Sequence, residues 1–225
     1  MAIIVGIGVW LGINLYPEAE PILIKNTDGK CILVASIVLD LSIGFNTIYG
    51  EQPQLAIWLE NEKTNEIKTI YVTSRAGKDD WSGKIMCQVA LPFWESRSGA
   101  LELNKILRKT EFDAVSSATP NSEELHVEAL LDSASVWKYF IEVNLSGDYN
   151  EMFNLYPNNT MDSEGNGQPS LIYGGSIAAL NGEYSEPTLL GRTGQIAAIS
   201  SIITDVNGIT TAKDIIKKVK LKVFK

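Results

Sequence analysis

The chain is poor in the side chains that most often hold metal ions. Its 225 residues include a single histidine, His126, and two cysteines, Cys31 and Cys87. A zinc site usually draws three or four ligands from these residue types, so the sequence predicts no zinc site. Positive charge is also scarce, because 27 Asp and Glu outnumber 19 Lys and Arg and give a net charge of −8. Nucleic-acid binding requires a basic surface, and we expect no nucleic-acid partner.

Helical periodicity is nearly absent, whereas period-two alternation recurs along the chain. Residues 55–59 and 67–73 alternate in this way and are separated by a polar segment, which predicts a hairpin with a long loop. Leu55, Ile57 and Leu59 point to one face of the first strand, and Ala56 and Trp58 to the other. Further strands are expected at 31–45, 136–145, 170–178, 195–203 and 219–223, and Leu91-Pro92-Phe93-Trp94 is expected to close another strand.

These short strands, separated by turn signals, predict an all-β antiparallel sandwich over residues 26–225. Lysines alternate with apolar residues in the last strand, which is typical of an exposed edge strand. Thr211 with Asp214 predicts the cap of one short C-terminal helix. The expected core includes Trp58, Ile70, Ile141, Val143 and Leu221.

The N-terminus carries the longest apolar run, from Ala2 to Ile13, and Pro17 and Pro21 follow it. A signal-peptide core has about 7–15 residues, and a membrane-spanning helix about 20. We therefore expect residues 1–20 to be a signal peptide or membrane anchor that places the domain outside the cytoplasm. No Lys or Arg precedes the run, and no small-x-small cleavage site follows it. The alternative is a buried N-terminal strand, which the glycines of the run would weaken.

The stretch Asp113-Ala114-Val115-Ser116-Ser117-Ala118-Thr119 precedes Pro120 near the middle of the chain. It resembles the covalent flavin-attachment signal of bacterial redox proteins, which runs Asp, two variable positions, Ser or Thr, Gly, Ala and Thr. The resemblance implies that a flavin transferase joins FMN to the Thr119 hydroxyl, with Ser116 in the Ser/Thr position and Asp113 seating the loop. Ser117 stands where the signal has glycine. The alternative is a strand end and turn that Pro120 terminates.

A wider set of motifs spans residues 30–225. It includes Tyr71-Val72-Thr73, Leu91-Pro92-Phe93-Trp94, Glu142-Val143-Asn144 and Asp148-Tyr149-Asn150. Together with residues 113–120 they resemble an uncharacterised family of predicted periplasmic, Ig-like bacterial domains. The genes of this family accompany flavin transferases and membrane redox proteins. The resemblance implies an exported Ig-like sandwich and does not imply an enzyme. We expect a non-catalytic binding or accessory module of an extracytoplasmic redox system. An electron-transfer protein carrying FMN on Thr119 is the alternative.

Other chemistries have weaker signals. A hydrolase would use Ser116 or Ser117 with His126, but the chain has no Gly-x-Ser-x-Gly elbow.

Residues 151–168 predict a long loop, which in a compact domain is usually functional or mobile.

Two further alternatives concern oxygen ligands and thiols. Asn144, Asp148, Asn150 and Glu151 offer oxygens that suit calcium, although their spacing matches no EF-hand loop. Cys31 and Cys87 would be able to pair in an exported protein, and otherwise we expect two buried thiols.

Overall fold

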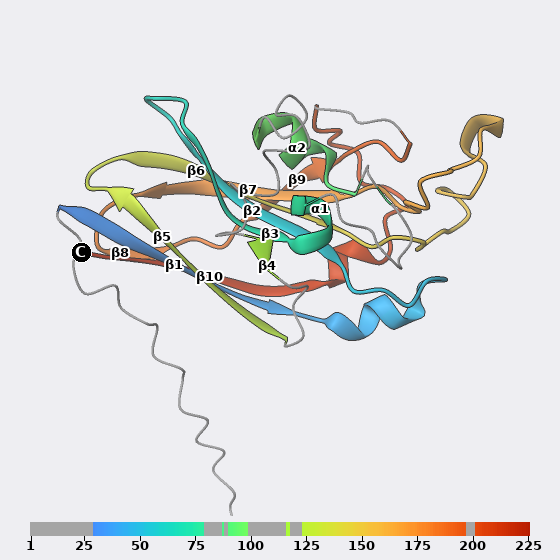
Figure 1. Cartoon of the computed structure of the whole chain (residues 1–225), viewed down its shortest axis with the longest axis horizontal. Helices are drawn as coiled ribbons and strands as arrows, with labels where there is room; N and C mark the ends of the chain where they lie inside the picture. Colours follow the sequence, from blue (N-terminus) through green and yellow to red (C-terminus); the bar gives the residue numbers. More distant parts are fainter. Residues whose placement is uncertain (1–28, 79–86, 88–89, 99–115, 118–122, 197–200) are drawn as a thin grey trace, which may run out of the picture.

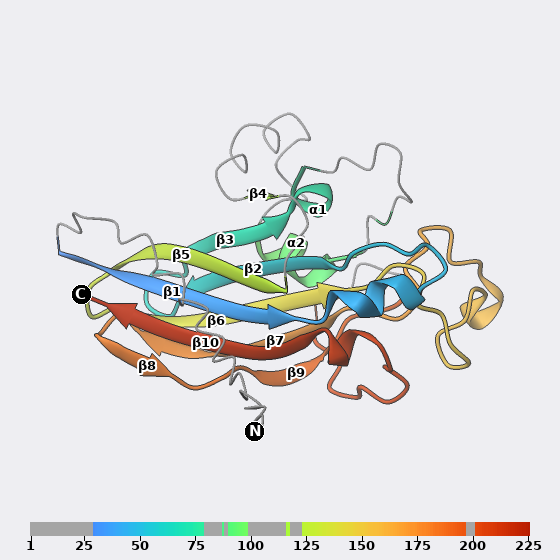
Figure 2. The ribbon, with the colours of Figure 1, turned by 90° about the horizontal axis from the view of Figure 1, so that it is seen from below.

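The computed structural model describes residues 29–78, 87, 90–98, 116–117, 123–196 and 201–225. Two β-sheets pack face to face (Figures 1 and 2). One has four strands in the order β5-β1-β10-β8, and the other has six in the order β4-β3-β2-β6-β7-β9. Neighbouring strands pair antiparallel, except for the short parallel pair β3–β4. The predicted all-β sandwich is confirmed.

The strands have unequal lengths. The four-stranded sheet consists of β5 (Glu124–Asp132), β1 (Lys30–Leu39), β10 (Ile216–Phe224) and β8 (Gly182–Tyr184). The six-stranded sheet consists of β4 (Ser116–Ser117), β3 (Ile67–Thr73), β2 (Gln54–Asn61), β6 (Val136–Asn144), β7 (Leu171–Ala178) and β9 (Thr188–Arg192).

Helical segments are short. They are α1 (Ser74–Lys78), α2 (Pro92–Ser98) and the 3₁₀ segments η1 (Leu41–Asn46), η2 (Pro157–Asn159) and η3 (Ala212–Asp214). Across the described ranges, no helix has the length and apolar character needed to cross a membrane.

The main hydrophobic cluster lies between the two sheets and follows from the alternation of the strands. Leu55, Ile57 and Leu59 of β2 point into it, as do Leu221 and Val223 of β10. The lysines between the apolar positions of β10 are exposed on the outer face. All five residues predicted for the core are buried: Trp58, Ile70, Ile141, Val143 and Leu221.

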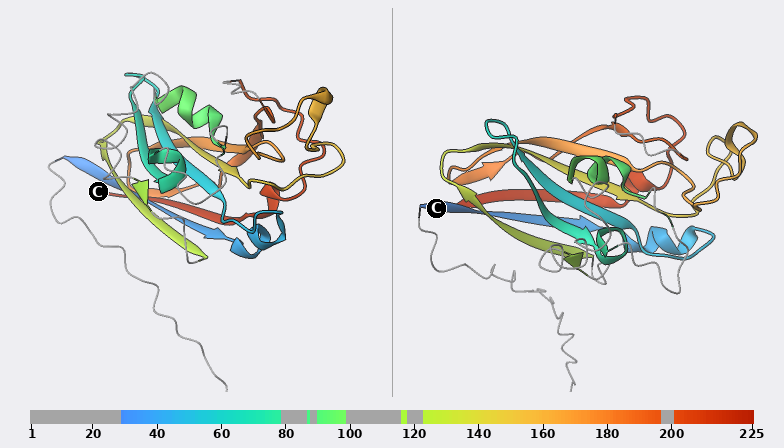
Figure 3. Two further views of the ribbon diagram at one scale, coloured as in Figure 1. Left: turned by 45° about the vertical axis from the view of Figure 1, so that its right-hand side comes forward. Right: turned by 45° about the horizontal axis from the view of Figure 1, so that its top comes forward.

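A second cluster covers the outer face of the six-stranded sheet. Helix α2 lies against this face (Figure 3), and its Phe93 and Trp94 are buried there. Trp58 of β2 stacks on Phe140 of β6 with ring centroids 5.2 Å apart, and Phe93 approaches Trp58 at 5.7 Å. The centre of this sheet is therefore buried on both faces, which explains why both sets of alternating residues in β2 are apolar.

Two local predictions are wrong. The segment Leu91-Pro92-Phe93-Trp94 does not end a strand but begins α2, with Pro92 at the first helical position, where its missing N–H costs no hydrogen bond. The strand β10 is not at a sheet edge, since β1 pairs along one side and β8 along part of the other. Its lysines therefore line an open outer face rather than protect an edge.

Other boundaries also differ from the sequence prediction. The first strand ends at Leu39, and η1 follows it, capped by Asp40, whose Oδ1 accepts from the Ser42 N–H at 3.1 Å. The C-terminal helix is only the three-residue η3, and Thr211 makes no side-chain cap. Within the expected strand 195–203, the described part shows only a bridge from Ile203 to Arg192.

Candidate functional site: the loop end of the sandwich

The long connections gather at one end of the sandwich. They are η1, the segment 145–170 between β6 and β7, and residues 193–196 and 204–211, and we refer to them together as the loop end (Figure 1, right). The start of β1 and the end of β10 lie at the opposite end, where Ile32 pairs with Phe224. The loop end is held by a chain of buried polar side chains, which begins at Glu142.

Glu142 is fully buried on β6 and joins three elements. Its carboxylate accepts hydrogen bonds from the backbone N–H groups of Phe93 at 3.3 Å and Trp94 at 2.7 Å, at the start of α2. It also accepts from the Ser170 hydroxyl at 2.6 Å, and Ser170 lies 2.7 Å from the Thr193 hydroxyl. Burial raises the pKa of Glu142 to about 7, although these hydrogen bonds oppose the shift.

Two residues further along β6, Asn144 extends the network into the loops. Its Nδ2 donates to Asn166 Oδ1 at 2.8 Å and to the Gln168 carbonyl at 3.3 Å. Asn166 Nδ2 donates in turn to the Gln195 carbonyl at 2.6 Å. The end of β6, the segment 145–170 and residues 193–196 are thus joined through side-chain amides, whose paired donors and acceptors fix one loop arrangement.

Asp148 and Gln168 form the next part of the network. Asp148 Oδ1 accepts from the Gln168 backbone N–H at 2.7 Å, and its Oδ2 accepts from the Thr211 hydroxyl. The Gln168 side chain donates to the Asp148 carbonyl at 2.6 Å and accepts from the Thr210 N–H at 2.6 Å. Burial raises the pKa of Asp148 to about 7, against the opposing effect of the Thr211 and Gln168 hydrogen bonds.

Asp162 fastens the outer part of the long loop. Its Oδ2 accepts from the Gly167 N–H at 2.9 Å and from the Tyr149 hydroxyl at 3.1 Å. Burial, and then the negative charge of Asp162, raise the pKa of Tyr149 above its ordinary value. Gly167 has a φ of +81°, and a Cβ there would meet Asp148, so this turn requires glycine.

Around this buried network, the surface of the loop end carries apolar side chains. Each of the following is more than half exposed: Phe45, Ile48, Met152, Tyr156 and Met161. Ile48 belongs to the segment after η1 and donates its backbone N–H to the Gly147 carbonyl at 3.2 Å, which connects the two sets of loops. Exposed apolar side chains on well-anchored loops are typical of a surface that contacts another protein.

The structure places the predicted flavin-attachment residues only in part. Ser116 lies in β4, the edge strand of the six-stranded sheet, where it pairs in parallel with Val72 of β3. Asp113 and Thr119 lie outside the described residues. The two described residues of the signal, Ser116 and Ser117, therefore lie at a sheet edge.

The hydrolase residues are not brought together in the predicted way. His126 of β5 shares a hydrogen bond of 2.9 Å between its Nδ1 and the Ser36 hydroxyl, and its Nε2 lies 3.6 Å from Glu124. The side chain of His126 is 46% exposed on the outer face of the four-stranded sheet. A hydrolase base is buried beside its nucleophile and an oxyanion-binding site, and this open face does not resemble such a site.

Of the predicted calcium ligands, Asp148 and Asn150 use their side-chain oxygens in hydrogen bonds, whereas Asn144 uses only its Nδ2 and Glu151 is exposed. Asn144 and Asp148 belong to the network, and Asn150 Oδ1 accepts from the backbone N–H groups of Met152 and Phe153 at 3.0 and 2.8 Å. Among the residues that the structure describes, no three His, Cys, Asp or Glu side chains are grouped to hold a metal.

The two cysteines are not joined by a disulfide, and they are buried in different clusters. Cys31 lies between the sheets, whereas Cys87 lies in the cluster under α2. The Cys87 thiol is 3.6 Å from Asn166 Oδ1, at the edge of the polar network.

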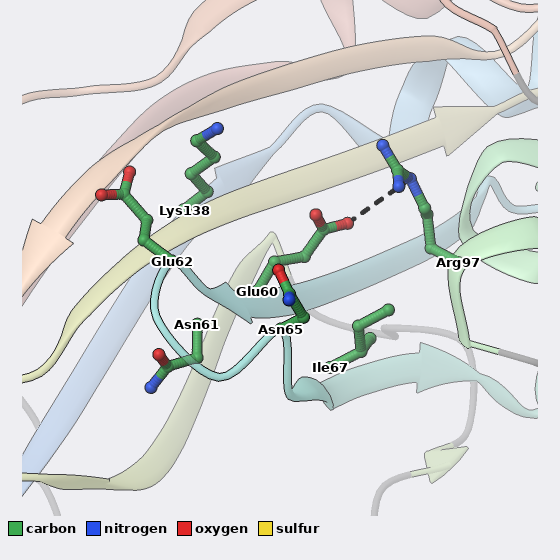
Figure 4. Close-up of a pocket in the computed structure, with 7 residues that line it drawn as sticks. All are labelled: Glu60, Asn61, Glu62, Asn65, Ile67, Arg97 and Lys138. Carbon is green, nitrogen blue, oxygen red and sulfur yellow. Dashed lines mark ion pairs between the residues drawn. The ribbon is translucent and has the colours of Figure 1, made fainter.

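A shallow polar groove of about 370 Å³ lies away from the loop end, beside the β2–β3 hairpin (Figure 4). Glu60 in this groove lies 3.6 Å from Arg97 of α2 and accepts from the Trp58 indole at 3.1 Å. Lys138 and Glu62 contribute one charge of each sign. Because Glu60 and Arg97 neutralise each other, the groove has no net field that would select a charged ligand.

Sequence reasoning missed Glu142, Gln168 and Asp162 as a connected set. A signal for Glu142 exists, because it interrupts the apolar run Phe140-Ile141-Glu142-Val143 in a strand buried on both faces.

Comparisons of the chain with protein-family models, with curated proteins and with solved structures gave no match.

Proposed function

We propose that the protein is a non-catalytic binding module, exported or anchored by its N-terminal segment, that holds a protein partner at the loop end. In this proposal it is an accessory component of an extracytoplasmic redox system. The observation that supports the binding role is that Met152, Tyr156 and Met161 are exposed on loops that a buried polar network holds in place. Loops that are already ordered lose little conformational entropy on binding, which favours a specific complex.

The exposed side chains of the loop end include Tyr156, Met152 and Met161, which are residue types common at interface cores. Tyr and Met are enriched at such cores, and charged residues are depleted there. The apolar side chains come from two separate chain segments, 45–48 and 152–161, so that a partner would contact a composite surface.

The test is cross-linking of the tagged full-length protein in its native host. We expect one adduct of defined mass in the wild type and its loss in the double variant Tyr156→Ser/Met161→Ser. The matched control is Val136→Ser/Leu180→Ser, which removes exposed apolar side chains outside the loop end. An adduct that survives in the loop-end variant, or that is lost equally in the control, contradicts the proposal.

Localisation has its own test. Cell fractionation should place the protein in the membrane or periplasm, and intact mass should show whether the N-terminal segment is retained. A cytoplasmic protein that retains Met1 would contradict the export part of the proposal and leave the binding role standing.

A second candidate is an electron-transfer protein with FMN attached covalently to Thr119. It is supported by the position of β4, because Ser116 and Ser117 of the flavin-attachment signal lie in an edge strand of the six-stranded sheet. The cofactor would supply the redox chemistry, and the protein would supply its placement.

Co-expression with a flavin transferase tests this candidate. The expected product is a yellow protein whose mass increases by one FMN group and whose colour persists after denaturation. Thr119→Val should abolish the colour, because only the acceptor hydroxyl is lost, whereas Ser117→Ala should retain it. An unmodified wild-type protein would remove the flavin role.

A further inference from the structure

The loop formed by residues 162–167 has an unusual arrangement of oxygen atoms. Its sequence is Asp162-Ser163-Glu164-Gly165-Asn166-Gly167, with side-chain oxygens at the first, third and fifth positions and glycine at the sixth. Calcium loops of the EF-hand type begin with this alternation. The Gly167 N–H donates to Asp162 Oδ2 and so closes the loop across its six residues.

Two carboxylate oxygens of this loop are buried and have no hydrogen-bond partner among the residues that the structure describes. Asp162 is 2% exposed, and its Oδ1 is buried without a hydrogen bond, although Oδ2 has two donors. Glu164 Oε2 is likewise buried and without a partner. The nearby Asn144 Oδ1 is a third such oxygen, since Asn144 uses only its Nδ2 in the network. A buried carboxylate oxygen that has neither a donor nor a cation beside it is unfavourable.

We propose that residues 162–167 bind a calcium ion, with Asp162 Oδ1 and Glu164 Oε2 as its carboxylate ligands. Calcium accepts carboxylate, amide and backbone carbonyl oxygens together with water. Two carboxylates are therefore enough when carbonyl or amide oxygens complete the coordination shell. Only the start of the loop resembles an EF-hand, because Tyr173 stands at the twelfth position, where a bidentate Glu is usual.

The chemistry of the oxygens favours calcium over other cations. Magnesium demands near-ideal octahedral geometry and keeps most of its water, whereas calcium tolerates irregular sites. Soft metals prefer sulfur or imidazole, and residues 162–167 contain neither Cys nor His. With two charged ligands, we expect a dissociation constant of about 10⁻⁴–10⁻³ M, as in extracellular calcium modules.

Binding would act directly on the surface of the loop end. Met161 immediately precedes the loop, and Tyr149 is joined to it through Asp162. An ion between Asp162 and Glu164 would neutralise their charges and hold the apolar surface in place. This inference does not depend on the identity of any partner.

The experiment uses the full-length protein in detergent after removal of divalent ions. Terbium, which replaces calcium in oxygen sites, should show luminescence sensitised by Tyr149, and calcium should quench it by competition. Calcium should also raise the melting temperature, because it binds the native state only, while equal magnesium should have little effect. Glu164→Gln should weaken calcium binding by about tenfold or more, since it removes one of two charged ligands.

The matched control is Glu151→Gln, which removes an exposed carboxylate from the same long connection. It should bind calcium as the wild type does. Asp162→Asn is a second test variant, but it also alters the acceptor of Gly167 and Tyr149, so Glu164→Gln decides the result. Equal calcium affinity in the wild type and Glu164→Gln, or equal stabilisation by calcium and magnesium, overturns the proposal.

Discussion

The body of the sandwich and its loop end are stabilised by different physical means. Between the sheets, the alternation of β2, β6 and β10 buries aliphatic side chains, and stability grows with the apolar area removed from water. At the loop end, Glu142, Asp148 and Gln168 are equally buried but contribute through paired donors and acceptors. Apolar contacts tolerate small shifts, whereas a polar network is stable in one arrangement only. The body thus provides stability, and the loop end provides a defined surface.

Adjacent residues of β6 allow the most direct test of this contrast. Ile141 points into the core between the sheets, and truncation to alanine should lower the free energy of unfolding by about 2–5 kcal/mol. Chemical denaturation measures the loss, with the exposed Leu180→Ala as control. A loss below about 0.5 kcal/mol, the usual size of surface effects, would mean that Ile141 is not packed as the structure places it.

The second test of the contrast between the body of the sandwich and the loop end is the pH dependence of stability. Burial raises the pKa of Glu142 from 4.5 to about 7, so between these values the folded state holds a proton that the unfolded state has lost. The free energy of unfolding should therefore fall as pH rises from about 4.5 to 7, on the order of 3 kcal/mol for this group at 1.36 kcal/mol per pKa unit. Asp148 should add a change in the same direction.

The variant Glu142→Gln isolates the contribution of Glu142 to the pH dependence of the free energy of unfolding. The slope of the free energy of unfolding against pH, between pH 4.5 and 7, should become smaller in this variant. Ile141→Ala should keep the wild-type slope. The slope is the readout, because the amide also leaves one backbone donor of α2 poorly paired. An unchanged slope in Glu142→Gln would show that this carboxyl does not titrate as its burial predicts.

A smaller effect is expected for Gln168→Ala. The change leaves the Thr210 N–H and the Asp148 carbonyl without their partners and should cost about 1–3 kcal/mol. Gln195→Ala is the control, because its side chain makes one exposed bond, to the Asn154 carbonyl. Similar losses in the two variants would mean that the network around Gln168 is not cooperative.

The smallest effect should come from the outer face of the four-stranded sheet. Lys220 is exposed on β10 opposite Ser36, and Lys220→Ala should change stability by less than about 0.5 kcal/mol. A loss above about 1 kcal/mol, beyond that range, would show that the lysine face contributes to folding.

The strands were predictable because burial on one or both faces leaves a period of two or a continuous apolar run. Trp58 and Ile141 illustrate this, since each was placed in the core from alternation alone. The helix α2 was not predictable in the same way, because seven residues carry too little periodicity to distinguish a helix from a strand end. Its position depends on Glu142, which is distant in the sequence and accepts its first N–H groups.

The polar network was hidden for a related reason. Asn166, Gln168 and Asp148 lie in a segment that reads as an ordinary polar loop. Only their mutual pairing, across separations of about twenty residues and more, shows that they are buried. The candidate flavin residue Thr119 stays a prediction from its motif.

The outer ends of β1 and β10 have a position with a mechanical consequence. β1 begins, and β10 ends, at the end of the sandwich opposite the loops. The ten residues of β1 extend over roughly 33 Å at about 3.3 Å per residue. A partner held at the end of the sandwich where β1 begins would therefore lie roughly 30 Å from the loop end.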